Sequence, residues 1–404
     1  MLATETPSIG TSPIKASSKM PTSTVYTIGA RGLKLNTAED AQELIAEMNQ
    51  IQNLSEVVFS GNTVGVEAGR AFAAALKDKI LIQKVNLSDM FTGRLREEIP
   101  LVLDAFAEAL EDKEHLVEVD MSDNAFGPAG AKPLMRLLSN NRHIQVLRFN
   151  NNGLGIEGGR LIASALLEAQ ETNVKEGKTS SLRVFIAGRN RLESKGAEHL
   201  SKVFAAHASL TEIRMPQNSI RPEGIEILAS ALAHCTQLET LDLQDNTFTD
   251  TGSMALAKAL PVFTNNLRHL NIGDCLLGIK GSAAIIKALT PGHELLERVN
   301  LAFGEIDTAG AALIPDMITN KKSLAMLELN GNAFDAESSV VQHIKDILRS
   351  HDHPDALDEL DDMDYEEDEE EDKEEEEEEK EPEADQDDEV DALANKLSGK
   401  LEIE

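Results

Sequence analysis

Apolar and polar positions alternate over short segments that recur along most of this chain. The repeated pattern, L-x-x-L-x-L-x-x-N-x-L, extends from residue 54 to residue 334. In one copy, polar Asp242 separates Leu241 from Leu243, and such alternation predicts a short strand with one buried face. Each copy therefore predicts a strand, followed by a turn at the same relative position.

A second apolar periodicity lies between the predicted strands. Ile225, Leu228 and Leu232 have the spacing of one helix face. Pro222 suits the first turn of that helix, because proline has no N–H to lose there. Each unit should then contain a strand, a loop, a helix and a return loop. A single unit cannot bury its apolar face alone, so stacked units are expected to share one core.

Ten copies align on the Asn-type position near the end of the pattern. They are Asn62, Met90, Asn124, Asn152, Asn190, Asn218, Asn246, Cys275, Gly304 and Asn332. Neighbouring copies are 28 or 29 residues apart, except for intervals of 34 and 38 residues that begin at Met90 and Asn152. This is the leucine-rich repeat in its long, ribonuclease-inhibitor-like class. It predicts an α/β solenoid, a horseshoe with a parallel sheet inside and helices outside, with the two insertions in loops, often on the binding face.

The repeated Asn has a structural explanation. Its side-chain amide is expected to bond main-chain groups where the chain turns off each strand. Cys275 stands in the same position. We therefore expect it to be the Cys variant of this structural position, in preference to a nucleophile or a metal ligand.

Composition divides the chain into three regions. Residues 1–22 are rich in Ser, Thr and Pro and predict a disordered lead, residues 23–354 hold the repeats, and residues 355–404 form an acidic tail. The tail holds 28 Asp and Glu residues and four Lys residues, within a formal net charge of −33 for the whole chain. Self-repulsion predicts disorder for the tail, and its composition fits either a solubilising role or the binding of basic partners.

The sequence contains little that an enzyme would need. The ten His residues are scattered, and no G-K-[ST] motif follows the recurrent glycines. No apolar stretch reaches the length of a membrane span, and residues 1–22 lack the apolar core of a secretory signal. Two Cys residues favour a reducing compartment. With no Trp and an acidic surface, the chain does not suit nucleic acid, so we expect it to bind another protein and no metal.

Two loops depart from the repeat. The copy at Met90 continues into an enlarged loop that contains Arg94, and the copy at Asn152 is preceded by a second Asn, Asn151. Both loops follow the carboxyl end of a parallel strand, so both side chains are expected at one rim of the horseshoe, roughly 10 Å apart along the stack. Taken alone, Asn151 would be an ordinary turn residue.

These loops belong to a larger set of segments that resembles a known family. The set includes Phe91-Thr92-Gly93-Arg94, Ser122-Asp123-Asn124-Ala125-Phe126-Gly127-Pro128, Asn151-Asn152-Gly153-Leu154-Gly155, Gly188-Arg189-Asn190-Arg191-Leu192-Glu193 and Leu243-Gln244-Asp245-Asn246-Thr247-Phe248. It resembles the Ran GTPase-activating proteins in the compact form found in fungi, from about residue 25 to the acidic tail. The F-T-G-R loop is specific, because a generic leucine-rich repeat has no reason to contain it. Animal members carry an extra C-terminal domain, so the resemblance leaves anchoring at the nuclear pore open.

The resemblance implies a function exerted on a partner enzyme. The family stimulates GTP hydrolysis by Ran, in support of nucleocytoplasmic transport, by positioning the catalytic Gln of the GTPase without an arginine finger. Asn151 would then orient that Gln, because an amide can donate and accept hydrogen bonds at once. The residues implied to contact the GTPase are Arg94, Arg96, Arg189, Arg191 and Asp245.

The same resemblance sets the expected partners and location. Ran would hold the GTP and the Mg²⁺, so no cofactor is expected on this chain. The expected partner is Ran–GTP, with or without a Ran-binding protein. We expect a monomer in the cytoplasm or its perinuclear part, with no contact to nucleic acid or membrane.

Two other classes of protein share parts of this pattern. Acidic leucine-rich proteins that bind histones or inhibit phosphatases also join such repeats to an acidic tail, but their repeats are fewer and shorter. Scaffolds of the ribonuclease-inhibitor type share the repeat length, but they are generally rich in Cys, whereas this chain has two. The 28-residue spacing and the F-T-G-R loop favour the GTPase activator.

Overall fold

The computed structural model describes residues 24–364, and they contain an eleven-stranded sheet with parallel pairing between all neighbours. Its strands, in spatial order, are β1 (Thr24–Thr27), β3 (Leu54–Val58), β5 (Lys84–Asn86), β6 (Glu118–Asp120), β7 (Val146–Arg148), β8 (Val184–Ile186), β9 (Glu212–Arg214), β10 (Thr240–Asp242), β11 (His269–Asn271), β12 (Arg298–Asn300) and β13 (Met326–Glu328). The spatial order follows the sequence order, as it must when each repeat stacks on the one before it.

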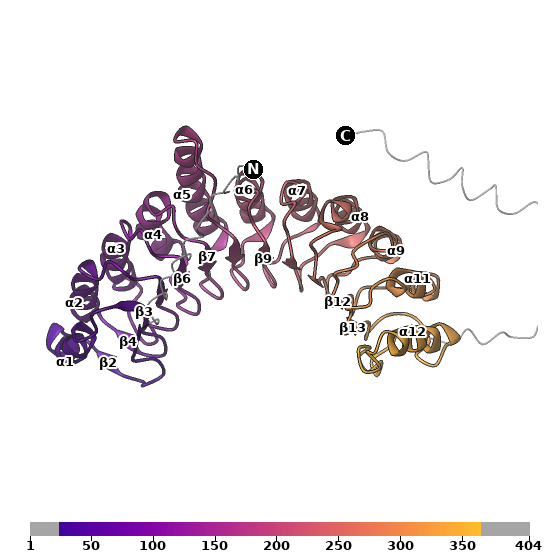
Figure 1. Cartoon of the computed structure of the whole chain (residues 1–404), viewed down its shortest axis with the longest axis horizontal. Helices are drawn as coiled ribbons and strands as arrows, with labels where there is room; N and C mark the ends of the chain where they lie inside the picture. Colours follow the sequence, from indigo (N-terminus) through magenta and orange to yellow (C-terminus); the bar gives the residue numbers. More distant parts are fainter. Residues whose placement is uncertain (1–23, 365–404) are drawn as a thin grey trace, which may run out of the picture. The chain divides into compact units, whose positions relative to one another are not determined.

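One or more helices follow most strands and cover the outer side of the stack. They are α1 (Ala38–Asn49), α2 (Val66–Lys77), α3 (Ile99–Leu110), α4 (Gly127–Asn140), α5 (Gly155–Lys175), α6 (Glu193–Ala206), α7 (Pro222–Leu232), α8 (Thr249–Ala259), the 3₁₀ helix η1 (Leu260–Phe263), α9 (Ile279–Leu289), α10 (Thr308–Ala311), α11 (Ile314–Ile318) and α12 (Ser339–Ser350). Within the repeat region, the strands line the inner side of the curve and the helices its outer side (Figure 1). The predicted α/β leucine-rich repeat solenoid is confirmed.

The core lies between the sheet and the helices. The middle residue of each short strand points into it, for example Val119, Leu147 and Phe185, each about 1 % exposed. Phe185 packs edge-on against Phe204 of α6, with ring centroids 5.6 Å apart. The flanking strand residues are turned to the inner face, so the alternation seen in the sequence is the alternation of faces. Pro222 opens α7, as predicted.

The ladder of Asn residues is buried and structural, as predicted. Asn190 donates from Nδ2 to the Phe149 carbonyl at 2.8 Å, and its Oδ1 accepts the Asn152 backbone N–H at 3.0 Å. One amide thus joins two repeats. In the same position, the Cys275 thiol donates to the Leu243 carbonyl at 3.4 Å, and burial raises the pKa of this thiol to about 12. A thiol that stays protonated at neutral pH is a poor nucleophile.

A second set of buried polar residues lies at the opposite edge of the sheet. Its members each donate to a carbonyl of a preceding helix or turn: Lys113, Asn141, His207, Cys235, His293 and Lys321. We call them the helix-end set. Asn141, for example, bonds the carbonyl of Leu110, the last residue of α3, at 3.1 Å. Carbonyls at a helix end lack partners within the helix, so for these the side-chain bond removes a cost that burial would otherwise impose. His207 differs, because it bonds the carbonyl of Leu166 in the middle of α5.

Only one of the two insertions lies in a rim loop. The interval after Met90 enlarges the loop that precedes α3, as predicted. The interval after Asn152 instead lengthens α5 to 21 residues, and this helix extends beyond its neighbours in Figure 1. The prediction of a second enlarged loop was wrong, because the inserted residues continue the helix.

The repeat domain extends beyond its predicted boundary at residue 354. At the amino-terminal end, strand β1 lies within the predicted domain and adds one pairing partner before the first aligned copy. At the other end, Ala356 is buried, its carbonyl accepts the Leu327 N–H at 2.7 Å, and Asp358 accepts the Leu329 N–H at 2.9 Å. Residues 355–364, predicted as the start of the tail, therefore pack against β13. The predicted lead and the remainder of the tail lie outside the described residues.

Candidate functional site

The loops at the carboxyl ends of the strands share an unusual backbone conformation. The residue immediately before each ladder position has a positive φ in all ten copies: Gly61, Asp89, Asp123, Asn151, Arg189, Gln217, Asp245, Asp274, Phe303 and Gly331. We call these residues the rim row. All of its non-glycine members are exposed. In Asn151, with φ of 52°, the backbone N–H donates to the Gly188 carbonyl of the next loop at 2.9 Å.

Three of the six predicted site residues belong to this row. Asn151, Arg189 and Asp245 occupy equivalent positions in three repeats, so their backbones present them in the same way. Arg191 lies two residues beyond Arg189, is exposed, and also has a positive φ of 54°. Gly, Asn and Asp adopt this region readily, whereas Arg does so at a cost of about 1–3 kcal/mol. The two arginines are therefore not explained by the backbone they occupy.

The Asn151 side chain is held by a neighbour in the same row. Its Nδ2 donates to Asp123 Oδ1 at 3.0 Å. A carboxylate accepts only, so this contact assigns the amide nitrogen to the Asp123 side. Within residues 24–364, no group donates to Asn151 Oδ1. The amide is thus oriented, with its acceptor free for a partner.

Arg94 lies in the enlarged loop but is turned toward the amino-terminal end of the domain. Its Nη2 donates to the carbonyls of Leu35 and Thr63, at 3.2 and 3.1 Å. These two residues belong to the small parallel sheet of β2 (Lys34–Leu35) and β4 (Thr63–Val64). A Cβ at Gly65 would lie 3.0 Å from Arg94 Nη1, so the guanidinium fills the space that this glycine leaves. Arg94 is half-buried and joins the loop to the first repeats.

The other predicted arginines are not tied down in this way. Arg96, Arg189 and Arg191 are exposed, and in the part of the chain that the structure describes none has a carboxylate within the 4.0 Å of an ion pair. Asp245 is likewise exposed and has no ion-pair partner there. Elsewhere ion pairs do form, as between Arg142 and Glu176 at 2.8 Å. The rim charges are therefore left available to a partner.

Sequence reasoning missed other members of the rim row as candidate site residues. Asp123 orients Asn151, and Gln217 and Asp274 stand in line with it. The signal was present, because each of these residues directly precedes a ladder position. The two predicted loops are brought to the same rim, with β6 between their strands.

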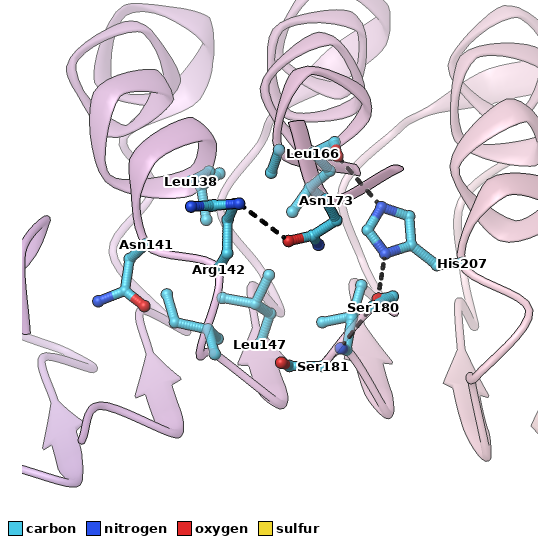
Figure 2. Close-up of a pocket in the computed structure, with 12 residues that line it drawn as sticks. Leu138, Asn141, Arg142, Leu147, Leu166, Asn173, Ser180, Ser181 and His207 are labelled. Carbon is cyan, nitrogen blue, oxygen red and sulfur yellow. Dashed lines mark hydrogen bonds between the residues drawn. The ribbon is translucent and has the colours of Figure 1, made fainter. Parts of the chain in front are cut away.

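A small cavity away from the rim holds a Ser–His pair. His207 Nδ1 lies 2.7 Å from Ser180 Oγ, and its Nε2 lies 3.1 Å from the Leu166 carbonyl, as Figure 2 shows. Burial lowers the His207 pKa, which favours the neutral ring. The cavity has a volume of about 20 Å³, enough for about one water molecule. His207 belongs to the helix-end set, and the cavity beside it has no room for a substrate.

The described residues give no sign of a metal centre or a membrane segment. They contain no grouping of three or more His, Cys, Asp or Glu side chains arranged to hold a metal ion. None of the helices in this region combines the length and the apolar character that crossing a membrane requires. The rim row therefore remains the candidate site.

Comparison with known proteins adds sequence relatives. The leucine-rich repeat family model matches residues 113–135, 140–163 and 234–257. The chain is 34 % identical to Ran GTPase-activating protein 1 of Saccharomyces cerevisiae, over 81 % of each chain. It is 47 % identical to Ran GTPase-activating protein 1 of Xenopus laevis, over 46 % of this chain and 33 % of that protein. A Drosophila melanogaster Ran GTPase-activating protein is 36 % identical over 76 % of this chain and 52 % of that one.

Proposed function

Since this chain belongs to the family of Ran GTPase-activating proteins, we propose that it stimulates GTP hydrolysis by Ran and uses the rim row to do so. The observation that carries the proposal is Asn151, whose exposed amide is oriented by Asp123 and has an unused acceptor. The chemistry belongs to the partner, which would bind GTP and Mg²⁺. This chain would contribute binding and orientation.

In a GTPase alone, the Gln that orients the attacking water is often poorly positioned. Phosphoryl transfer to water is limited by the positioning of the attacking water and by stabilisation of charge, and GTPases use a Gln to orient that water. A Gln side chain carries an amide, so a second amide can pair with it through one donated and one accepted hydrogen bond. Asn151 Oδ1 would accept from the Gln amide of Ran and hold it in the productive orientation.

An arginine finger is not part of this mechanism. A finger must reach the transferred phosphate, but Arg94 is engaged with the Leu35 and Thr63 carbonyls of its own chain. We infer that Arg94 is a positioning residue that fixes the enlarged loop against the first repeats. Ran would then meet a loop already ordered, which reduces the entropic cost of binding.

The remaining predicted residues would bind Ran directly. Arg96, Arg189 and Arg191 offer unpaired guanidinium groups for carboxylates or carbonyls of the GTPase, and Asp245 offers a carboxylate for a basic residue. Charges of both signs on one rim specify the register of the partner and speed its association more than they add affinity. The full assembly would be Ran–GTP with this chain as a monomer, with or without a Ran-binding protein, acting in nucleocytoplasmic transport from the cytoplasm or its perinuclear part.

The test is single-turnover hydrolysis of GTP on purified Ran, with and without this chain. We expect a large acceleration by the wild-type chain. Asn151→Ala should lower the rate at saturating concentration by about 10²-fold, the size of effect seen when one preorganised transition-state contact is removed. Asp123→Ala should lower it by a smaller factor, because the amide remains but is no longer held.

Asn140→Ala is the matched control. Asn140 is an exposed Asn at the end of α4, away from the rim, where it donates to Glu111 at 2.7 Å. With this variant, Ran should hydrolyse GTP as fast as with the wild-type chain. Full acceleration by Asn151→Ala would contradict the orienting role. No acceleration by the folded wild-type chain would move the proposal to the acidic histone-binding class.

A further inference from the structure

Two large apolar side chains stand exposed on the same rim, in neighbouring loops. Phe303 is a member of the rim row and is 46 % exposed, and Leu276 follows the ladder residue Cys275 and is 48 % exposed. The Asp274 N–H donates to the Ala302 carbonyl at 2.8 Å and ties the two loops together. We call Phe303 and Leu276 the apolar rim pair.

Neither residue is explained by the fold. Phe303 has φ of 50° and Leu276 has φ of 49°, a region that bulky residues adopt only at a cost. Most equivalent positions of the rim row hold Gly, Asp or Asn, which tolerate this conformation. Both side chains also stay largely in contact with water, so they contribute little of the stabilisation that a buried apolar side chain gives. Two unfavourable choices in adjacent loops point to a role outside folding.

The Phe303 ring lies over the next loop. A Cβ built on Gly331 of the next loop would lie 2.2 Å from ring atoms Cδ1 and Cε1 of Phe303, so the ring rests against the space where a side chain would be. A glycine at 331 is therefore required for this ring position.

We propose that the apolar rim pair is the apolar anchor of the Ran-binding surface. This inference rests on the proposed function. The predicted contact residues are all charged or amide side chains, whereas stable interfaces usually combine polar contacts with an apolar, often aromatic, anchor. The apolar rim pair supplies the apolar contact that the charged and amide residues cannot make.

The position of the pair fits the same partner. Phe303 follows β12, two strands beyond the β10 loop of Asp245, which is roughly 10 Å along the stack. The span from the β5 loop of Arg94 to the β12 loop covers seven strand spacings, roughly 34 Å. A compact domain of about 200 residues is about 40 Å across, so one GTPase can cover Asn151 and Phe303 together.

The experiment measures affinity and stability on the same variants. Phe303→Asn and Leu276→Asn place at each position a residue that accepts a positive φ. Thermal unfolding should therefore occur at the wild-type temperature or above it. Binding to Ran loaded with a non-hydrolysable GTP analogue should weaken about tenfold for Phe303→Asn, and further for the double variant. The rate of hydrolysis at saturating activator should not change.

Two further variants separate an apolar contact from loop geometry. Phe303→Tyr keeps the ring and should keep most of the affinity. Ile80→Asn removes a residue that is 68 % exposed in the turn after α2, at the opposite edge of the sheet, and should bind Ran as the wild type does.

The outcomes distinguish this inference from the proposed function. Acceleration of hydrolysis with unchanged affinity in Phe303→Asn and in the double variant overturns the anchor and leaves the activator intact. Failure of the wild-type chain to bind the loaded Ran overturns both. If Phe303→Asn lowered the free energy of binding and the free energy of unfolding by equal amounts, Phe303 would have a structural role, and the anchor would also be overturned.

Discussion

Asn151 and Asn152 are adjacent and chemically identical, yet they belong to two different regions of the molecule. Asn152 is fully buried in the ladder, where it donates to the Met121 carbonyl at 2.9 Å and accepts the Asn124 N–H at 2.9 Å. Asn151 is exposed in the rim row, where its single side-chain contact is to Asp123. The ladder consumes the hydrogen-bonding capacity of its amides, whereas the rim leaves part of that capacity unused. The residue type is the same at both positions. What distinguishes the structural Asn from the candidate functional one is whether all hydrogen-bonding groups of its amide already have partners.

The largest effect on stability is expected in the ladder. Asn152→Ala leaves the buried Asn124 N–H without a partner and removes one of the two amide donors to the Met121 carbonyl, which should lower the free energy of unfolding by about 2–4 kcal/mol. The temperature of unfolding should fall by roughly 3–6 °C, as circular dichroism would record. Asn151→Ala should unfold at the wild-type temperature. Equal losses in the two variants would remove the distinction between ladder and rim.

Arg94 and Arg189 sharpen the comparison within the rim. Arg94→Ala removes two charge-assisted hydrogen bonds, so the free energy of unfolding should fall by about 1–3 kcal/mol, and association with Ran should weaken because the loop loses its anchor. Arg189→Ala should weaken association without lowering the temperature of unfolding. With either variant at saturating concentration, Ran should hydrolyse GTP at the rate seen with the wild-type chain. A loss of saturated rate in Arg94→Ala with full thermal stability would instead indicate a finger.

The smallest effect on stability is expected from a change of pH, which acts on buried His residues at the other edge of the sheet. Burial lowers the pKa values of His207 and His293 below 6.5, so the unfolded chain takes up these protons at a higher pH than the native chain does. Their contribution is complete above about pH 6.5 and is lost as the pH falls through the native pKa values. His207→Asn should reduce this acid sensitivity, because Asn141 bonds a helix carbonyl at the equivalent place. The exposed His115→Asn serves as the control, and an equal change there would contradict the prediction.

The solenoid itself could be predicted because its signal is periodic. The buried centre of each strand and the buried Asn recur with the repeat, so the sequence predicts both their identity and their environment. The helix-end set also recurs with the repeat, eleven residues before a ladder position, but no common residue type marks it. Lys113, Asn141 and His207 share the ability to donate a hydrogen bond, and their partners lie 28 to 41 positions away, so the sequence does not show what they bind.

The placement of the candidate site residues was predicted in part, because strand positions recur with the repeat and side-chain directions do not. Placement of Asn151, Arg189 and Asp245 on one rim follows from strand direction and register. The direction of the Arg94 side chain does not, because carbonyls of Leu35 and Thr63 determine it, 59 and 31 positions earlier. Arg94 was predicted beside the other arginines, but the structure turns it away from them.

The segment after α12 closes the end of the sheet. Asp358 accepts the backbone N–H groups of Leu329 and Asn330 through its two carboxylate oxygens, while Ala356 and Leu327 share a main-chain bond. An open terminal strand would offer these groups to any extended chain nearby, which is how sheets add to one another and grow into fibres. A negative charge placed on that edge ends the array and repels further strands. The sheet therefore ends at an edge whose backbone groups are already paired, and a further strand cannot readily add there.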